Sequence, residues 1–66
     1  MIKTDDLKGI IVKRKKTQKD IAKILNISPK TFYAKMAKGV FGSDEIEIMI
    51  DELQIENPID IFFAKK

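Results

Sequence analysis

Apolar residues recur along this chain at helical spacing, in short segments that alternate with turn-forming residues. Within each segment the apolar positions fall on one face of a helix and leave the other faces polar. Four such stripes stand out: Leu7, Ile10 and Ile11; Ile21, Ala22 and Leu25; Phe32 and Met36; and Ile46, Met49, Ile50 and Leu53. The pattern predicts an all-α chain built from short amphipathic helices.

Start and stop signals divide segment 17–38 into two helices with a tight turn between them. Thr17 and Asp20 match a capping box, in which hydroxyl and carboxylate satisfy free backbone donors at a helix start. Asn26 stands where the first helix must stop, and asparagine tolerates the left-handed backbone that ends many helices. Ser28 and Pro29 match an N-cap followed by proline at the first helical position. A plain helical hairpin is the alternative, but it does not require this spacing of caps.

The remaining segments predict three more helices. Thr4, followed by two acids, is expected to start the first one, and Gly9 inside it costs roughly 1 kcal/mol relative to alanine. Because of that cost, we expect a close helix contact at Gly9. Gly39 ends the helix that starts near Ser28, a fourth helix covers about 44–53, and Asn57–Pro58 opens a fifth helix that extends through Phe63. We therefore expect one compact five-helix domain over residues 1–66.

Composition narrows the class of protein. The chain has 66 residues and no Cys or His, so disulfides and the usual soft metal ligands are absent. No apolar run approaches the roughly 20 residues that cross a bilayer. The acid pairs Asp5–Asp6 and Asp44–Glu45 stand at helix starts, where capping explains them better than catalysis does. We expect a cytoplasmic protein that is not an enzyme and that uses no cofactor, metal, membrane or small-molecule substrate.

Charge is distributed unevenly, although the net value is only +3. Residues 8–38 contain ten Lys or Arg and a single acid, Asp20, whereas residues 39–64 contain seven acids and no base. A basic half attracts phosphates and supplies most of the non-specific affinity of a nucleic-acid-binding protein. The charge pattern indicates a polyanion as partner of the first half of the chain.

The run T-Q-x-x-I-A-x-x-L-x-I-S-x-x-T-F, which begins at Thr17, resembles the Cro/CI, or lambda-repressor-like (XRE-type), helix-turn-helix family. The upstream LKGIIV and the ending NPIDIFF also resemble small Cro-like or modulator-of-repression proteins of temperate phages. The chain departs from the family pattern at three positions: Asn26 replaces the usual Gly, and Lys16 and Ser43 stand where apolar residues are common. The resemblance implies a five-helix lambda-repressor-like domain with its helix-turn-helix at about 18–37. It also implies a transcriptional regulator of a phage-type genetic switch in the bacterial host cell.

Helix-turn-helix docking assigns roles to the residues of this motif. The helix at 29–37 would lie in the major groove with its first residues toward the base edges. Lys30 could donate to guanine, and Pro29 and Ala34 offer apolar contact to a thymine methyl. Tyr33 could reach either a base or a phosphate. Gln18 matches a family residue that holds a phosphate, and the run at 13–16 could add phosphate contacts. The predicted contacts to double-stranded DNA are Thr17, Gln18, Lys19, Ser28, Pro29, Lys30, Thr31, Tyr33, Ala34 and Lys38.

A second hypothesis is a modulator that acts mainly by binding a partner repressor. Segment 28–38 contains no Arg, Asn or Gln, the side chains that best discriminate between bases. Apolar residues on the acidic half exceed what a small core requires, and such surplus marks a contact site. The expected interface, in a homodimer or in a heteromer with a repressor, comprises Ile48, Ile61, Phe62 and Phe63; the alternative is that they cover the core edge.

Overall fold

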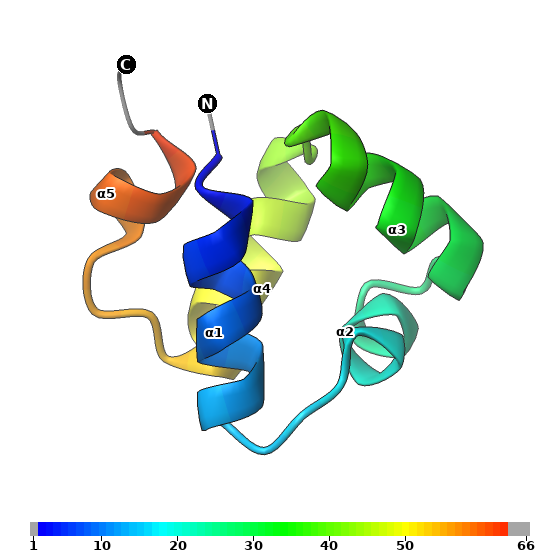
Figure 1. Cartoon of the computed structure of the whole chain (residues 1–66), viewed down its shortest axis with the longest axis horizontal. Coiled ribbons are helices and arrows are strands. Elements are labelled where there is room, and N and C mark those ends of the chain that lie inside the picture. Colours follow the sequence, from blue (N-terminus) through cyan, green and yellow to red (C-terminus); the bar gives the residue numbers. More distant parts are fainter. Residues whose placement is uncertain (1, 64–66) are drawn as a thin grey trace.

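Five helices and no strands make up residues 2–63, the part of the chain that this computed structural model describes. Figure 1 shows α1 in the middle of the molecule. α5 lies on one side of it, the α2–α3 pair lies on the other side, and α4 lies behind it. The all-α prediction is confirmed. The helices are α1 (Thr4–Lys13), α2 (Gln18–Ile24), α3 (Pro29–Lys38), α4 (Ser43–Leu53) and α5 (Pro58–Phe62).

The start signals predicted for α2 and α3 are present. The Asp20 N–H donates to the Thr17 hydroxyl over 3.1 Å, and the Thr17 N–H donates to the Asp20 carboxylate over 2.8 Å. Pro29 is the first residue of α3, after Ser28 as N-cap. The start of α1 at Thr4 is also confirmed, although its N-cap position is Lys3, which makes no side-chain cap. Local signals therefore define both helices of the central pair.

The first four helices end in the same backbone motif. One residue adopts a left-handed conformation, and the N–H of the next residue donates to the carbonyl five positions earlier, which satisfies a free carbonyl at the helix end. These bonds are Lys16 to Ile11 at 3.0 Å, Ile27 to Ala22 at 3.0 Å, Val40 to Lys35 at 3.1 Å and Ile55 to Ile50 at 3.0 Å. The left-handed residues are Lys15, Asn26, Gly39 and Gln54. The sequence predicts the helix ends at Asn26 and Gly39, whereas Lys15 and Gln54 are not residue types that favour a left-handed backbone.

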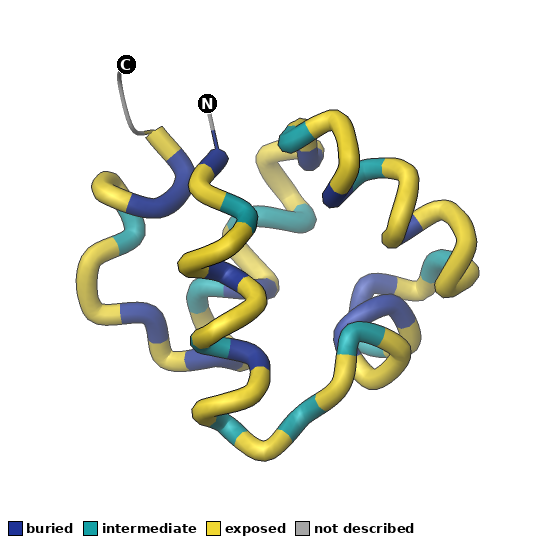
Figure 2. The backbone as a smooth tube through the Cα atoms, in the orientation of Figure 1, coloured by how far each residue is buried: buried dark blue, intermediate teal, exposed yellow. Residues whose placement is uncertain are grey.

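The core collects one face of every helix, and the buried positions alternate with exposed ones along the backbone tube in Figure 2. Phe32 is fully buried, and its ring lies 5.5 Å from that of Phe41, which comes from the α3–α4 connection. Gly9 makes no close contact, because a Cβ added there would meet nothing within 4 Å, so that expectation is wrong. The buried residues are Ile2, Leu7, Ile11, Ile21, Ala22, Leu25, Phe32, Met36, Phe41, Met49, Leu53, Ile55, Ile61 and Phe62.

The position of α5 corrects part of the predicted interface. The Lys3 N–H donates to the Ile61 carbonyl over 2.8 Å and ties the segment before α1 to α5. Ile61 and Phe62 are each only 3% exposed, because α5 packs against α1 and turns both side chains inward. They belong to the core of this chain and are not part of its exposed surface. α5 ends at Phe62, one residue earlier than predicted.

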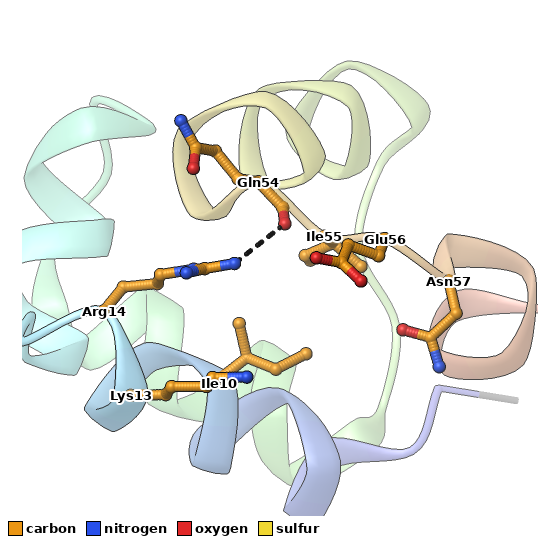
Figure 3. Close-up of a pocket in the computed structure, with 7 residues that line it drawn as sticks. All are labelled: Ile10, Lys13, Arg14, Gln54, Ile55, Glu56 and Asn57. Atoms are coloured by element: carbon orange, nitrogen blue, oxygen red, sulfur yellow. Dashed lines mark hydrogen bonds between the residues drawn. The ribbon is translucent and has the colours of Figure 1, made fainter.

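Arg14 joins the end of α1 to the end of α4. Its Nε donates to the Leu53 carbonyl over 2.8 Å, and its Nη2 donates to the Gln54 carbonyl over 3.1 Å, as Figure 3 shows for Gln54. A guanidinium suits this place because the last carbonyls of a helix are unpaired and carry partial negative charge. Arg14 thus has a structural role, although it lies in the basic run that could have faced phosphates.

Candidate nucleic-acid interface

The outward face of α3 is fixed by what the helix buries. Phe32 and Met36 point into the core, as predicted, which leaves Lys30, Ala34 and Ala37 on the opposite face. All three outward residues are exposed. The outward face of α3 therefore carries one cation, Lys30, and two small side chains, Ala34 and Ala37.

The predicted DNA contacts all reach the surface of the α2–α3 pair. Gln18 is half-buried, and the other nine are exposed. They form two groups, one at the start of α2 and one along α3. The first group is Thr17, Gln18 and Lys19, and the second is Ser28, Pro29, Lys30, Thr31, Tyr33, Ala34 and Lys38.

Three hydroxyls at these helix starts form hydrogen bonds in the caps, and two of them keep a proton that can be donated elsewhere. Ser28 Oγ donates to Thr31 Oγ1 over 2.9 Å and accepts from the Thr31 N–H over 3.1 Å. Because Thr31 Oγ1 only accepts in this pair, its own proton can donate to an outside acceptor. The Thr17 hydroxyl accepts from the Asp20 N–H, so its proton can also donate to an outside acceptor. Thr17 and Thr31 are therefore better placed than Ser28 to donate to a phosphate oxygen.

Two open hollows flank α3, and together they contain five of the ten predicted DNA contacts. The first lies where α1, the start of α2 and the middle of α3 meet, and it is lined by Thr4, Lys8, Gln18, Tyr33, Met36 and Ala37. The second lies at the turn between α2 and α3 and is lined by Lys19, Lys23, Asn26, Ile27, Ser28 and Pro29. Tyr33 thus lies toward α1, beside Gln18, whereas Lys30 lines neither hollow.

Thr4, Lys8 and Ala37 also line this surface, although the sequence does not predict them there. Ala37 could have been found, because it follows Ala34 by three residues and Lys30 by seven on the same helical face. Thr4 and Lys8 could not, because helical periodicity locates the flank of α1 but does not say which neighbour it meets. Only the packing of α1 beside the α2–α3 pair brings them to the site.

Lys35 is not a free cation of this surface. Its ammonium donates to both carboxylate oxygens of Glu45 at 2.7 and 2.8 Å, and Glu45 also accepts from the Gly42 N–H at 2.8 Å. Burial raises the pKa of Glu45, but the hydrogen bonds from Lys35 and Gly42 and the nearby positive charge outweigh it, so the pKa lies below its usual value. The pair ties the second half of α3 to the start of α4. It therefore holds the outward face of α3 in place.

Replacing Glu45 with glutamine is expected to lower the free energy of unfolding by about 1 kcal/mol at neutral pH. A lowered folded-state pKa means that the stabilisation is fully present above the ordinary pKa of 4.5 and is lost as the pH falls through the folded value. The stability difference between the two proteins should therefore shrink in acid. Urea unfolding at a series of pH values measures it, with Glu47→Gln on an exposed position of α4 as control. A difference that stays constant from pH 7 to pH 3 would contradict this assignment.

The acidic half carries exposed apolar side chains of its own. Ile48 and Phe63, both predicted interface residues, are 39% and 58% exposed. Ile59, which had not been predicted, is 71% exposed and precedes Phe63 by four residues. The Phe63 N–H donates to the Ile59 carbonyl over 3.0 Å, so Ile59 and Phe63 lie on one side of the last segment described.

Comparison with protein-family models, with curated proteins and with solved structures finds no significant match for this chain. Within residues 2–63, no helix combines the length and the apolar character needed to cross a bilayer. The same residues contain no group of three or more acidic side chains arranged to hold a metal ion.

Proposed function

We propose that the protein is a double-stranded DNA-binding regulator and that α2 and α3 form a helix-turn-helix of the lambda-repressor-like type. The observation that carries the proposal is the exposed face of α3 around Lys30, held outward by the burial of Phe32 and Met36. Capping hydroxyls at the starts of α2 and α3 flank this face. A helix that exposes one face, carries a cation there and is fixed by its buried face matches the requirement for docking in a major groove.

Charge supports the same proposal. The basic residues of segment 8–38 belong to α1, α2, α3 and their connections, whereas the acids after Gly39 belong to α4, α5 and the connection between them. α2 and α3 themselves contain a single carboxylate, Asp20, and it is engaged in the cap of α2 at Thr17. We propose that phosphate contacts dominate the affinity, and that Lys30 supplies the one strong base contact.

Titration of short DNA duplexes by fluorescence anisotropy tests this function. The logarithm of the binding constant should fall linearly with the logarithm of salt concentration, with a slope of about −0.9 per phosphate neutralised. Lys30→Met should reduce the difference in affinity between DNA sequences. Lys38→Met should instead lower the affinity for every sequence by a similar factor. The same slope for a duplex and for a simple polyanion such as heparin, with no effect of Lys30→Met on preference, would contradict groove docking.

A modulator that acts through another protein is the second candidate, and the exposed Ile48, Ile59 and Phe63 favour it. Acids adjoin two of them in the sequence, Glu47 before Ile48 and Asp60 after Ile59, so these side chains would suit a basic partner, a repressor in this hypothesis. The same side chains could serve a homodimer, the form in which we propose that the DNA-binding protein acts. A duplex that is bound only after the neighbouring regulator is added would favour the modulator, and binding by the chain alone would favour the DNA-binding function.

A further inference from the structure

We propose that the hollow between α1, α2 and α3 is a phosphate-binding site in which Lys8 supplies the charge. This inference rests on the proposed DNA binding and names one contact within it. The ligand class is a backbone phosphodiester of the bound duplex. The assignment also gives Tyr33 a phosphate to hold rather than a base to read.

Three helices supply the polar groups of this hollow. Thr4 and Lys8 are four residues apart on α1, so they stand one above the other on the side that faces α2 and α3. Gln18 contributes an amide from the start of α2, and Tyr33 contributes a phenol from α3. The ammonium, the amide and the two hydroxyls all can donate hydrogen bonds.

The charge of the lining favours an anion. Among the six lining residues Lys8 carries the single full charge, and none is a carboxylate. Met36 and Ala37 form the apolar part of the lining. Because Ala37 also belongs to the outward face of α3, the hollow is continuous with the surface that would enter the groove. A phosphodiester beside that groove would therefore meet the hollow directly.

The position of Tyr33 separates it from the base-reading residues. It lines the hollow together with Gln18, while Lys30 and Ala34 point outward. Its ring rests edge-on against Phe32 with centroids 6.4 Å apart, which restrains the side chain on this flank. Tyr33→Phe should therefore lower the affinity for all DNA sequences by the same factor and leave the sequence preference unchanged.

The chain offers a matched control for Lys8. Lys8 and Lys13 are both exposed on α1, and replacing either with glutamine lowers the net charge from +3 by one. Lys13, however, lines a different hollow with Ile10, Arg14 and the α4–α5 connection, as Figure 3 shows. Although the sequence alone allowed phosphate contacts for the whole run at 13–16, this position puts Lys13 outside the hollow that α1 forms with α2 and α3. Long-range attraction changes by a similar amount in both variants. Any excess effect at Lys8 therefore reports local contact.

The experiment measures the binding of wild-type, Lys8→Gln and Lys13→Gln proteins to a random-sequence duplex over a range of salt concentrations. Lys8→Gln should weaken binding on the order of tenfold at low salt and reduce the salt slope by about 0.9, whereas Lys13→Gln should change both much less. Lys8→Arg should restore the slope. Circular dichroism checks that each variant is folded.

The outcomes separate the two proposals. If the wild-type protein binds and the Lys8 and Lys13 variants lose affinity equally, the phosphate site is overturned while DNA binding stands. A wild-type protein that binds no duplex at low salt overturns both. A Lys8 variant that changes sequence preference instead of the salt slope would also overturn the phosphate assignment, because phosphate contacts carry no sequence information.

Discussion

Replacing Phe32 with alanine is expected to lower the free energy of unfolding by about 3–5 kcal/mol. The side chain is completely buried where α3 meets the core, and its ring packs 5.5 Å from that of Phe41. Truncation removes the buried apolar area and leaves a cavity that the surrounding helices can only partly fill. A single domain of this size has little stability in reserve, so much of the population should be unfolded.

The neighbouring aromatic residue provides the control. Tyr33 belongs to the same helix but is 44% exposed, and Tyr33→Ala should cost far less stability. Urea unfolding of wild-type, Phe32→Ala and Tyr33→Ala proteins, followed by circular dichroism at 222 nm, measures the three free energies. Phe32→Leu should fall between the wild-type protein and Phe32→Ala. Equal losses at Phe32 and Tyr33 would mean that α3 does not pack as described.

Replacing Arg14 with methionine is expected to cost about 1.5–3 kcal/mol of folding stability, because hydrogen bonds from a charged donor are lost at two carbonyls. Both carbonyls, those of Leu53 and Gln54, terminate α4, and Nε and Nη2 reach them together. Methionine retains most of the aliphatic stem, so the loss reports the guanidinium rather than the packing. Arg14→Lys should recover only part of the stability, because an ammonium lacks the planar fork that bonds both carbonyls.

Lys13→Met tests whether charge alone explains the effect at Arg14. It removes the same unit of charge from the adjacent, exposed position of α1 and should change the stability by less than about 0.5 kcal/mol. Thermal unfolding at low and at high salt completes the comparison, since a directly hydrogen-bonded group is screened less than an exposed charge. A salt-sensitive loss of the same size in both variants would contradict the capping role of Arg14.

Arg14 and Lys35 together show that the basic half is not wholly available for binding. Each of these two residues reaches the acidic half, Arg14 at the carboxyl end of α4 and Lys35 at Glu45 near its amino end. They hold α4 at both ends against the rest of the molecule. Other cations, including Lys30 and Lys8, remain on the proposed DNA surface. The helices that carry them are held in position by the contacts of Arg14 and Lys35.

The helices, most of their limits and the inward face of α3 follow from local residue patterns. Thr17 and Asp20 are three positions apart, and Ser28 and Pro29 are adjacent, so a short stretch of sequence contains both members of each signal. The buried pair Phe32 and Met36 follows in the same way from helical spacing. A short-range cause can be recognised without knowing where the rest of the chain lies.

Other features depend on residues that are distant in sequence, and only the packed structure decides them. Ile61 and Phe62 are buried because α5 lies against α1, although adjacent apolar residues at the end of a chain equally suit an exposed interface. Arg14 bonds to carbonyls about forty positions away, and Lys8 meets Tyr33 in a hollow that three helices form. Local patterns set which face of each helix is apolar. The packing of the helices around a common core decides which helix covers that face. It also decides which polar side chains from different helices come together.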